Sequence, residues 1–341
     1  MKINHKKWTD NQLPKKVLFI RIQAMGDVMI TQPYIKGFHE SYPDIKIHFL
    51  TREEDQGIPF MFDMFDKIWR IKGGRNKYLQ LFYGTLLIPV LLFQRYDIIY
   101  DLQDHKISRI IRFILRSKAW TVFDRFSPVP AGERTYEAIK TVGLNDFAPD
   151  YSKIPIALNL GREFLKRYSH SENLIIINPA GFFESRNWPE SYYLGWAKLM
   201  MNYYDGDVTF MFVGIERIRK IAENFHKKYP DNTLNLVNKT SPSEAFGLVQ
   251  NAKFMLSEDS GLMHMSWISG VPTLALFGSS RSDWSRPLGN HSLLLGSADL
   301  ECGNCLLRTC KFNDNRCLTR YTPEIVFEYS IKLLEQVWKR N

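Results

Sequence analysis

The stretch RIQAMGDVMITQP (residues 21–33) follows a short apolar run, residues 17–20, and leads into residues with helical spacing. It predicts a strand that passes into a helix through a turn holding one glycine, Gly26, and one aspartate, Asp27. Turns at the ends of parallel strands are where α/β domains bind their ligands. The Gly-x-Gly-x-x-Gly fingerprint of nicotinamide dehydrogenases is absent, which argues against that class. A carboxylate in this place also has a purely structural explanation, because the N–H groups at a helix start favour it.

Short apolar runs and helix-length segments alternate along the chain, which predicts two doubly wound α/β domains in tandem. The first domain is predicted over residues 1–160 and the second over residues 161–322, with residues 147–164 as a polar linker. Residues 323–341 are predicted to form an amphipathic helix. We consider the first domain as a surface on which this helix packs back. Two facing sheets of this kind would hold a substrate between them. The predicted strands are residues 17–22, 45–50, 67–70, 98–101, 119–122, 174–178, 208–213, 234–237, 254–257, 273–277 and 292–295.

The composition favours a polyanionic partner. The chain has 341 residues, 45% of them apolar, and a formal net charge of +9 with a pI near 9.2. Such a charge is typical of proteins that bind nucleic acid, anionic membrane surfaces or phosphorylated glycolipids. The first residues lack the apolar region of a signal peptide, so we expect a cytoplasmic protein, with peripheral association at the inner membrane face as an option. The longest apolar stretch, residues 81–93, is too short to span a membrane and is predicted to be a buried or interfacial helix.

The stretch EDSGLMHMSWISGVPTLALFG (residues 258–278) predicts a phosphate site in the second domain, because it ends one strand and opens a helix. Gly261 lets a phosphate approach the backbone closely, and Ser260 adds a hydroxyl group. His264 lies one turn further on and has two interpretations. It contacts the oxygens of the same phosphate, or it packs in the core, which is commoner for a single histidine among apolar neighbours.

Two further residues follow predicted strands of the second domain. Arg186, in SRNWPE (residues 185–190), is placed to reach a phosphate, with a solvated loop arginine as the alternative. Glu216, which ends VGIE (residues 213–216), is placed to accept hydrogen bonds from a ribose or a base. An ordinary glutamate in the first turn of a helix explains Glu216 equally well.

Together these motifs resemble glycosyltransferase family 9, the ADP-heptose:lipopolysaccharide heptosyltransferases. The resemblance rests on RIQAMGDV, on DLQ after the fourth strand, on SRNWPE, on VGIE and on the EDSG stretch, which span nearly the whole chain in the family's order. It implies a GT-B fold of two Rossmann-like domains and an inverting, metal-independent transfer with Asp27 as general base. It also implies an ADP-heptose donor and a lipopolysaccharide inner-core or similar surface-glycan acceptor. The residues implied to bind the nucleotide sugar are Arg186, Glu216, Asp259, Ser260, Gly261 and His264.

Acceptor recognition is expected in the first domain, because a phosphorylated or carboxylated glycolipid core needs basic contacts. The candidates are Gln103, His105, Arg109 and Arg134. Arginines on a protein surface are common, so each of these singly is also explained without a ligand. A second enzyme hypothesis keeps the fold but changes the donor to another nucleotide sugar, or the acceptor to a protein.

All four cysteines fall within CGNCLLRTCKFNDNRC (residues 302–317). Their spacing is compatible with a tetrahedral thiolate site for structural zinc or iron, with four reduced loop thiols as the alternative. The implied ligands are Cys302, Cys305, Cys310 and Cys317. A basic chain with clustered cysteines also suggests a zinc-ribbon nucleic-acid binder. The spacer is short and few basic residues flank the thiols, so we rank that hypothesis low and expect no nucleic acid as partner.

Overall fold

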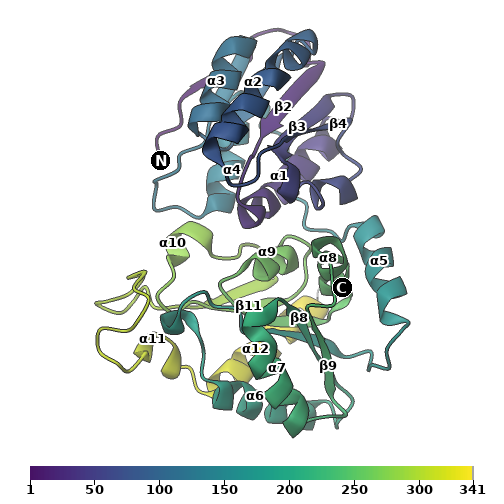
Figure 1. Cartoon of the computed structure of the whole chain (residues 1–341), viewed down its shortest axis with the longest axis vertical. Helices are drawn as coiled ribbons and strands as arrows, with labels where there is room; N and C mark the ends of the chain where they lie inside the picture. The colour runs from purple at the N-terminus through teal and green to yellow at the C-terminus, as the bar shows by residue number, and fades with distance from the viewer. Residues whose placement is uncertain (340–341) are drawn as a thin grey trace. The chain divides into compact units, whose positions relative to one another are not determined.

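The computed structural model describes residues 1–339 and divides into two compact units (Figure 1). The first unit comprises Met1–Asp150, and the second begins at Tyr151. Each unit is built on one six-stranded sheet, which confirms the predicted fold class of two doubly wound α/β domains. Within residues 1–339, no helix is long and apolar enough to cross a membrane.

The first sheet consists of β1 (His5–Lys6), β2 (Lys16–Ile20), β3 (Lys46–Arg52), β4 (Lys67–Ile71), β5 (Ile98–Asp101) and β6 (Ala119–Val122). Its strand order is β1-β6-β5-β2-β3-β4, and every strand is parallel to its neighbours except β1, which pairs antiparallel with β6. The order reverses between β2 and β5. The loops that follow these two strands therefore meet at the switch point, where sheets of this kind bind ligands.

The helices of the first unit are α1 (Met25–Ser41), α2 (Lys77–Phe93), α3 (Lys106–Leu115) and α4 (Ala131–Lys140), with the short 3₁₀ turns η1 (Glu53–Asp55) and η2 (Pro59–Met61). Phe38 of α1 packs edge-on against Phe19 and Tyr100, whose rings stack 4.4 Å apart. The alternate residues Leu18 and Ile20 belong to another core cluster, to which α2 and α3 contribute. This alternation is what a strand buried on both faces requires. α2 is buried only along the side that packs on this cluster.

The second sheet repeats the arrangement. Its strands are β7 (Leu174–Asn178), β8 (Thr209–Gly214), β9 (Thr233–Val237), β10 (Phe254–Glu258), β11 (Thr273–Leu276) and β12 (Ser292–Leu295). They are all parallel, in the order β12-β11-β10-β7-β8-β9. The order reverses between β7 and β10, so the loops after these strands meet at a second switch point.

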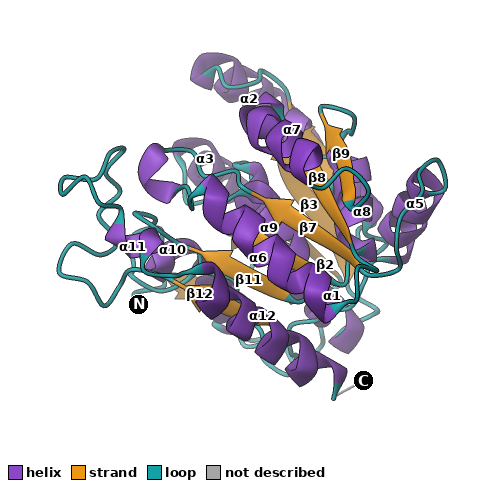
Figure 2. Cartoon of the chain, turned by 90° about the horizontal axis from the view of Figure 1, so that it is seen from below, coloured by secondary structure: helices purple, strands orange, loops and turns teal. Residues whose placement is uncertain are grey.

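The helices of the second unit are α5 (Pro155–Leu165), α6 (Glu190–Tyr203), α7 (Arg219–Lys228), α8 (Pro242–Asn251), α9 (Gly261–Trp267), α10 (Ser282–Ser285), α11 (Arg316–Thr319) and α12 (Pro323–Trp338), with the 3₁₀ turns η3 (Glu184–Arg186) and η4 (Glu216–Ile218). α6, α7 and α12 cover one face of the sheet and share one apolar core with it (Figure 2). α9 packs beside β10 and β11, and its Met263 forms a small core cluster with Ala275 of β11 and with Phe277, just after that strand. α8 packs against both α5 and α9.

All eleven predicted strands are present, with ends shifted by at most two residues. The prediction of a linker over residues 147–164 is corrected, because this stretch contains most of α5. α5 packs so closely on α8 that a Cβ atom on Gly161 would lie 2.2 Å from the carbonyl oxygen of Gly247. This packing places α5 in the second unit, so the units divide at residue 150, before the expected boundary.

The position expected for the C-terminal helix is also corrected. α12 packs in the core of the second unit rather than on the first domain, with Val326, Leu333 and Leu334 buried there. The hydroxyl of Ser330 accepts a hydrogen bond from the Trp196 indole of α6 at 3.1 Å. The amphipathic pattern identified the helix, but an apolar stripe does not specify which of two similar cores it covers.

Candidate functional site

Asp27 lies in the first turn of α1, just after β2. Its Oδ1 is 2.7 Å from Nη2 of Arg21, and its Oδ2 accepts a hydrogen bond from the backbone N–H of Ala24 at 3.1 Å. The side chain is still 41% exposed. The carboxylate therefore stabilises the helix start, as the structural alternative predicted, and also remains open to a ligand on one side.

Arg21 orients this carboxylate, although it was not among the predicted site residues. Its side chain is buried, its Nη1 donates to the carbonyl of Leu102, and its guanidinium lies 4.6 Å from the ring centre of Phe123. These contacts fix the cation that faces Asp27, and ion-paired hydrogen bonds of this kind are directional. An arginine at the end of the first apolar run was the signal for this role in the sequence.

Two predicted acceptor residues lie in the same neighbourhood. The Oε1 of Gln103 accepts hydrogen bonds from the backbone N–H groups of Ile22 and Gln23 at 2.9 and 3.0 Å, so Gln103 joins the loop after β5 to the loop after β2. Arg134 is buried, and its guanidinium lies 4.8 Å from the ring centre of Phe123. We call the following residues the Asp27 cluster: Arg21, Asp27, Gln103, Phe123 and Arg134.

The other two predicted acceptor residues gather around Asp104 instead. Arg109 forms an ion pair with Asp104 at 2.6 Å, and both line an open hollow of about 510 Å³ beside Trp120. His105 precedes α3 and is partly buried. Burial lowers the pKa of His105, and the positive charge of nearby Arg125 lowers it further. The four candidates thus divide into a pair in the Asp27 cluster and a pair at the start of α3.

In the second unit, Arg186 and Asp259 face each other from the loops after β7 and β10. Nη1 of Arg186 lies 3.3 Å from Oδ2 of Asp259, which also accepts a hydrogen bond from the Ser280 hydroxyl at 2.7 Å. The guanidinium lies 4.9 Å from the ring centre of Phe183, and its Nε makes no hydrogen bond with any described residue. The predicted phosphate-binding arginine is therefore held in place by Asp259 and by the ring of Phe183.

The turn that opens α9 joins the same site. The Ser260 hydroxyl caps α9 and accepts a hydrogen bond from the Asn178 side chain at 2.6 Å. At Gly261 nothing lies within 4 Å of where a Cβ atom would be, so the backbone is open to a ligand. His264 is buried, and its Nδ1 accepts a hydrogen bond from the Trp267 indole at 3.0 Å. The core-packing alternative for His264 is therefore present in the structure.

Glu258 is a fully buried carboxylate at the end of β10, which the sequence analysis did not select. It accepts hydrogen bonds from the backbone N–H groups of Gly181 and Trp188, each at 2.6 Å, and from the Tyr193 hydroxyl at 3.0 Å. Gly181 and Trp188 bracket Arg186, so Glu258 fastens the arginine loop to the sheet. Burial raises the pKa of Glu258 to about 7, and the three donors oppose this rise. We call the following residues the Arg186 cluster: Arg186, Glu258, Asp259, Ser260 and His264.

Glu216 begins η4, directly after β8, and its side chain is exposed. Its carboxylate pairs with Arg219 at 2.8 Å and accepts a hydrogen bond from Asn238 at 2.7 Å. These contacts stabilise the local turn. A contact between Glu216 and the ribose or base of a nucleotide stays a prediction.

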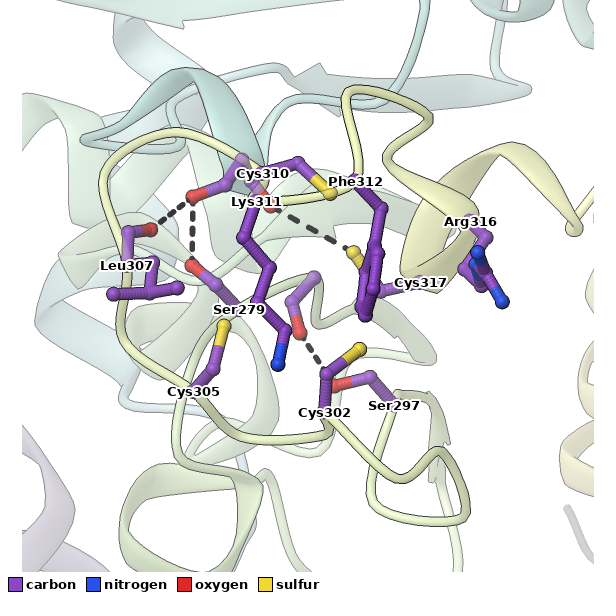
Figure 3. A pocket seen from close by; sticks show the side chains of 12 residues that line it. Ser279, Ser297, Cys302, Cys305, Leu307, Cys310, Lys311, Phe312, Arg316 and Cys317 are labelled. Atoms are coloured by element: carbon purple, nitrogen blue, oxygen red, sulfur yellow. Dashed lines mark hydrogen bonds between the residues drawn. The ribbon is translucent and has the colours of Figure 1, made fainter.

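The four cysteines line one pocket, three of them from the loop between β12 and α11 and Cys317 from α11 itself (Figure 3). All four are free thiols, and within residues 1–339 no three His, Cys, Asp or Glu side chains are gathered closely enough to hold a metal ion. This cysteine loop is joined to the arginine loop through Ser185. The Ser185 hydroxyl lies 2.8 Å from that of Ser279 and donates to the carbonyl of Leu307, and its N–H donates to the carbonyl of Arg308 at 3.3 Å. The residue beside Arg186 is thus anchored on the cysteine loop.

The sequence is similar to known proteins over most of its length. The model of glycosyltransferase family 9 (heptosyltransferase) matches residues 87–315. Lipooligosaccharide heptosyltransferase 2 of Campylobacter jejuni is 25% identical over 187 residues, and lipopolysaccharide heptosyltransferase 1 of Pseudomonas aeruginosa is 22% identical over 354 residues. The first alignment covers 54% of this chain and 57% of the relative, so the chain spans little more than half of that relative's length. The second alignment covers 91% of this chain and 96% of the relative.

The fold is similar to that of solved glycosyltransferases. A glycosyl transferase family 9 protein from Veillonella parvula has a TM-score of 0.78 at 16% identity, over 94% of this chain and 97% of that one. Escherichia coli heptosyltransferase WaaC with ADP-2-deoxy-2-fluoro heptose has a TM-score of 0.64 at 16% identity, over 93% and 99%. The iron-containing dodecameric glycosyltransferase TibC from enterotoxigenic E. coli has a TM-score of 0.52 at 11% identity, over 98% and 78%. At these identities the likeness concerns the fold.

Proposed function

Since the chain belongs to glycosyltransferase family 9, we propose that it transfers a heptose from ADP-heptose to the inner core of a lipopolysaccharide or a similar surface glycan. The Campylobacter and Pseudomonas relatives are heptosyltransferases by name, and WaaC was solved with ADP-2-deoxy-2-fluoro heptose. The observation that carries the proposal is the convergence of Arg186, Ser260 and the open backbone at Gly261 on one switch point. A cation, a hydroxyl and an uncovered backbone are what a diphosphate requires.

In the proposed reaction, Asp27 is the general base. Arg21 and the N–H of Ala24 hold the carboxylate, and its exposed side is available to the acceptor hydroxyl. The hydroxyl proton passes to Asp27 while the hydroxyl oxygen bonds to the anomeric carbon of the donor sugar. The bond from that carbon to the β-phosphate oxygen breaks at the same time, and ADP leaves. A one-step displacement of this kind inverts the anomeric centre.

The leaving ADP carries negative charge that must be stabilised as the bond breaks. In the Arg186 cluster, Arg186 supplies the positive charge and Ser260 supplies a hydroxyl group for this purpose. Donors that are already fixed before the reaction stabilise developing charge without the cost of reorganisation. In this proposal, side chains therefore perform the role that a divalent cation has in metal-dependent glycosyltransferases.

The acceptor is proposed to be a glycolipid, which places the working enzyme at a membrane surface on the cytoplasmic side. The candidate acceptor residues remain Gln103, His105, Arg109 and Arg134. Arg134 and Gln103 lie near the proposed base, whereas Arg109 lines the open hollow near Trp120. The positive charge of both places suits a phosphorylated or carboxylated sugar core.

A transfer assay with a panel of donors tests the proposal. The chain is mixed with a heptose-deficient glycolipid and, in separate reactions, with ADP-heptose, another ADP-sugar, a UDP-sugar and a GDP-sugar. Mass analysis of the glycolipid is expected to show one added heptose, with inverted configuration, only with ADP-heptose. Faster transfer from another donor, or sugar found on a protein acceptor instead, contradicts the proposal.

We also propose that the cysteine loop binds one structural zinc or iron ion. The four thiols line one pocket, but in the part of the chain that the structure describes no three of them are gathered closely enough to hold an ion, so binding would require the loop to bring them together. Four thiolates would then complete a tetrahedral site for either metal. The ligands are Cys302, Cys305, Cys310 and Cys317. Protein purified without chelating resin is expected to hold about one ion per chain. Cys305→Ser should lose the metal and lower the melting temperature, whereas metal-free protein with four titratable thiols and unchanged melting on substitution contradicts the site.

A further inference from the structure

One side of α2 is an exposed apolar strip. Residues 78–94 contain no charged side chain, and the helix buries only the side that packs on the first sheet. Large apolar residues recur on the outer side every three or four positions, which is the spacing of one helix face. These residues, the α2 strip, are Tyr78, Phe82, Leu86, Val90 and Phe93. Their exposed fractions run from 43% at Val90 to 86% at Tyr78, and a row of this size exposed to water indicates an interaction surface.

The chain around the α2 strip is strongly basic. Residues 67–118 hold eleven lysines and arginines against three aspartates and no glutamate, whereas the whole chain has 45 basic and 36 acidic residues. On α3, which packs beside α2, Phe113 is 77% exposed among basic side chains. The exposed basic residues next to the strip and on α3 are Lys72, Arg75, Lys77, Arg95, Lys106, Arg109 and Arg116. Residues 67–118 therefore carry a net charge of +8, and seven of their exposed basic side chains lie near the ends of α2 or along α3.

We propose that the α2 strip docks on the surface of an anionic lipid membrane. α2 has 17 residues and is about 25 Å long, so it is suited to lie in the plane of the interface, with its apolar side among the headgroups. Lysines and arginines at its ends and on α3 then contact lipid phosphates. A second copy of this chain is a poorer match, because a two-fold contact would bring the same basic residues against one another. This inference depends on the proposed function in one respect, namely that the acceptor is a glycolipid.

Co-sedimentation of the full chain with lipid vesicles tests this surface without donor or acceptor. Vesicles of phosphatidylcholine alone are compared with vesicles that also contain phosphatidylglycerol. We expect binding to the anionic vesicles, and Phe82→Ser/Leu86→Ser/Phe93→Ser should weaken it about tenfold or more. Lys72→Gln/Arg75→Gln/Lys77→Gln should weaken it roughly fivefold or more, on the anionic vesicles only.

The matched control changes three exposed apolar residues outside the strip, Leu13→Ser/Ile156→Ser/Tyr203→Ser, and should bind as the unaltered chain does. Melting curves confirm that each variant is folded. Equal binding to neutral and anionic vesicles, or full binding by the strip variant, overturns the proposal. An unaltered chain that is dimeric and becomes monomeric in the strip variant also overturns it, because a second copy then covers the strip. Transfer to a delipidated acceptor separately tests the proposed function, since either result can fail without the other.

Discussion

The Asp27 cluster and the Arg186 cluster occupy equivalent places in two similar sheets, but Asp27 and Arg186 are held in different ways. Each cluster lies where the strand order reverses. Asp27 is held directly, by one buried arginine and one backbone N–H. Arg186 pairs with Asp259, and its loop is held in addition, since Glu258 fastens the loop at two backbone points and Ser185 fastens it to the cysteine loop. We infer that the first cluster performs the chemistry, which depends on one side chain, and that the second binds the donor through a shared framework.

The largest effect is expected for Asp27→Asn. Asparagine keeps an oxygen to accept from the N–H of Ala24, but it cannot take the proton of the acceptor hydroxyl. Turnover in the heptose transfer assay should fall on the order of 10²-fold or more. Because the ion pair with buried Arg21 is also lost, the melting temperature should fall as well, so turnover is measured well below the melting temperature of the variant. Asp44→Asn changes an exposed aspartate of the same unit and should leave turnover unchanged. Near-normal turnover of Asp27→Asn would return Asp27 to a role in starting the helix.

A large loss of stability is expected for Glu258→Ala, since it leaves the buried N–H groups of Gly181 and Trp188 without an acceptor. The free energy of unfolding, measured with urea, should fall by about 4 kcal/mol, at 1–3 kcal/mol per group. ADP affinity should fall as well, because the loop that carries Arg186 is released. Tyr193→Phe removes one donor and should cost only about 1 kcal/mol. Equal costs for the two variants would mean that Glu258 does not hold the loop.

The free energy of unfolding should also depend on pH, because the Glu258 carboxyl titrates differently in the folded and unfolded chain. Glu258 has a pKa of about 7 in the folded chain and an ordinary value of 4.5, so between these values the folded chain keeps a proton that the unfolded chain has lost. The free energy of unfolding should therefore fall as the pH rises through this window, by about 3 kcal/mol, and level off above it. Urea unfolding across the window should show a shallower fall for Glu258→Gln. A parallel pH dependence in the two proteins would contradict this assignment.

A smaller effect is expected for Ser185→Ala. The change removes the hydroxyl contact to Ser279 and the bond to Leu307 but keeps the backbone bonds between the two loops. We expect a loss of about 1 kcal/mol in stability and a few-fold weaker ADP binding. Ser297 lines the same pocket, but its hydroxyl donates to the carbonyl of Gly278 instead. Ser297→Ala should therefore leave ADP binding unchanged. Weaker binding in both variants would assign the effect to the pocket as a whole.

The sequence predicted the sheets and the turns that carry Asp27 and Ser260 well, because both follow local patterns, whereas the binding roles of these two residues stay predictions. Alternating apolar runs located every predicted strand, and the turns after them located Asp27 and Ser260. The family resemblance agrees with the match to the family 9 model. These features depend on residues that are neighbours in the chain, so periodicity and turn chemistry identify them.

The supporting residues were harder to predict, because their partners are distant in the chain. Glu258 bonds the N–H groups of residues 181 and 188, and Arg21 bonds the carbonyl of Leu102. No local pattern records such a pairing, and a buried carboxylate looks like any other polar residue at a strand end. The same limit explains α12, whose apolar stripe suited either core, and Gln103, whose amide oxygen holds the loop after β2.

The division of labour between the two clusters is tested most directly by calorimetric titration of ADP and adenosine into the unaltered chain, Asp27→Asn and Arg186→Ala. We predict that Asp27→Asn binds ADP as the unaltered chain does. Arg186→Ala should lose about 1.5–3 kcal/mol of ADP affinity, the worth of a charge-assisted contact, and keep its affinity for adenosine. Equal weakening of ADP by both substitutions, or equal loss of ADP and adenosine in Arg186→Ala, would contradict the account.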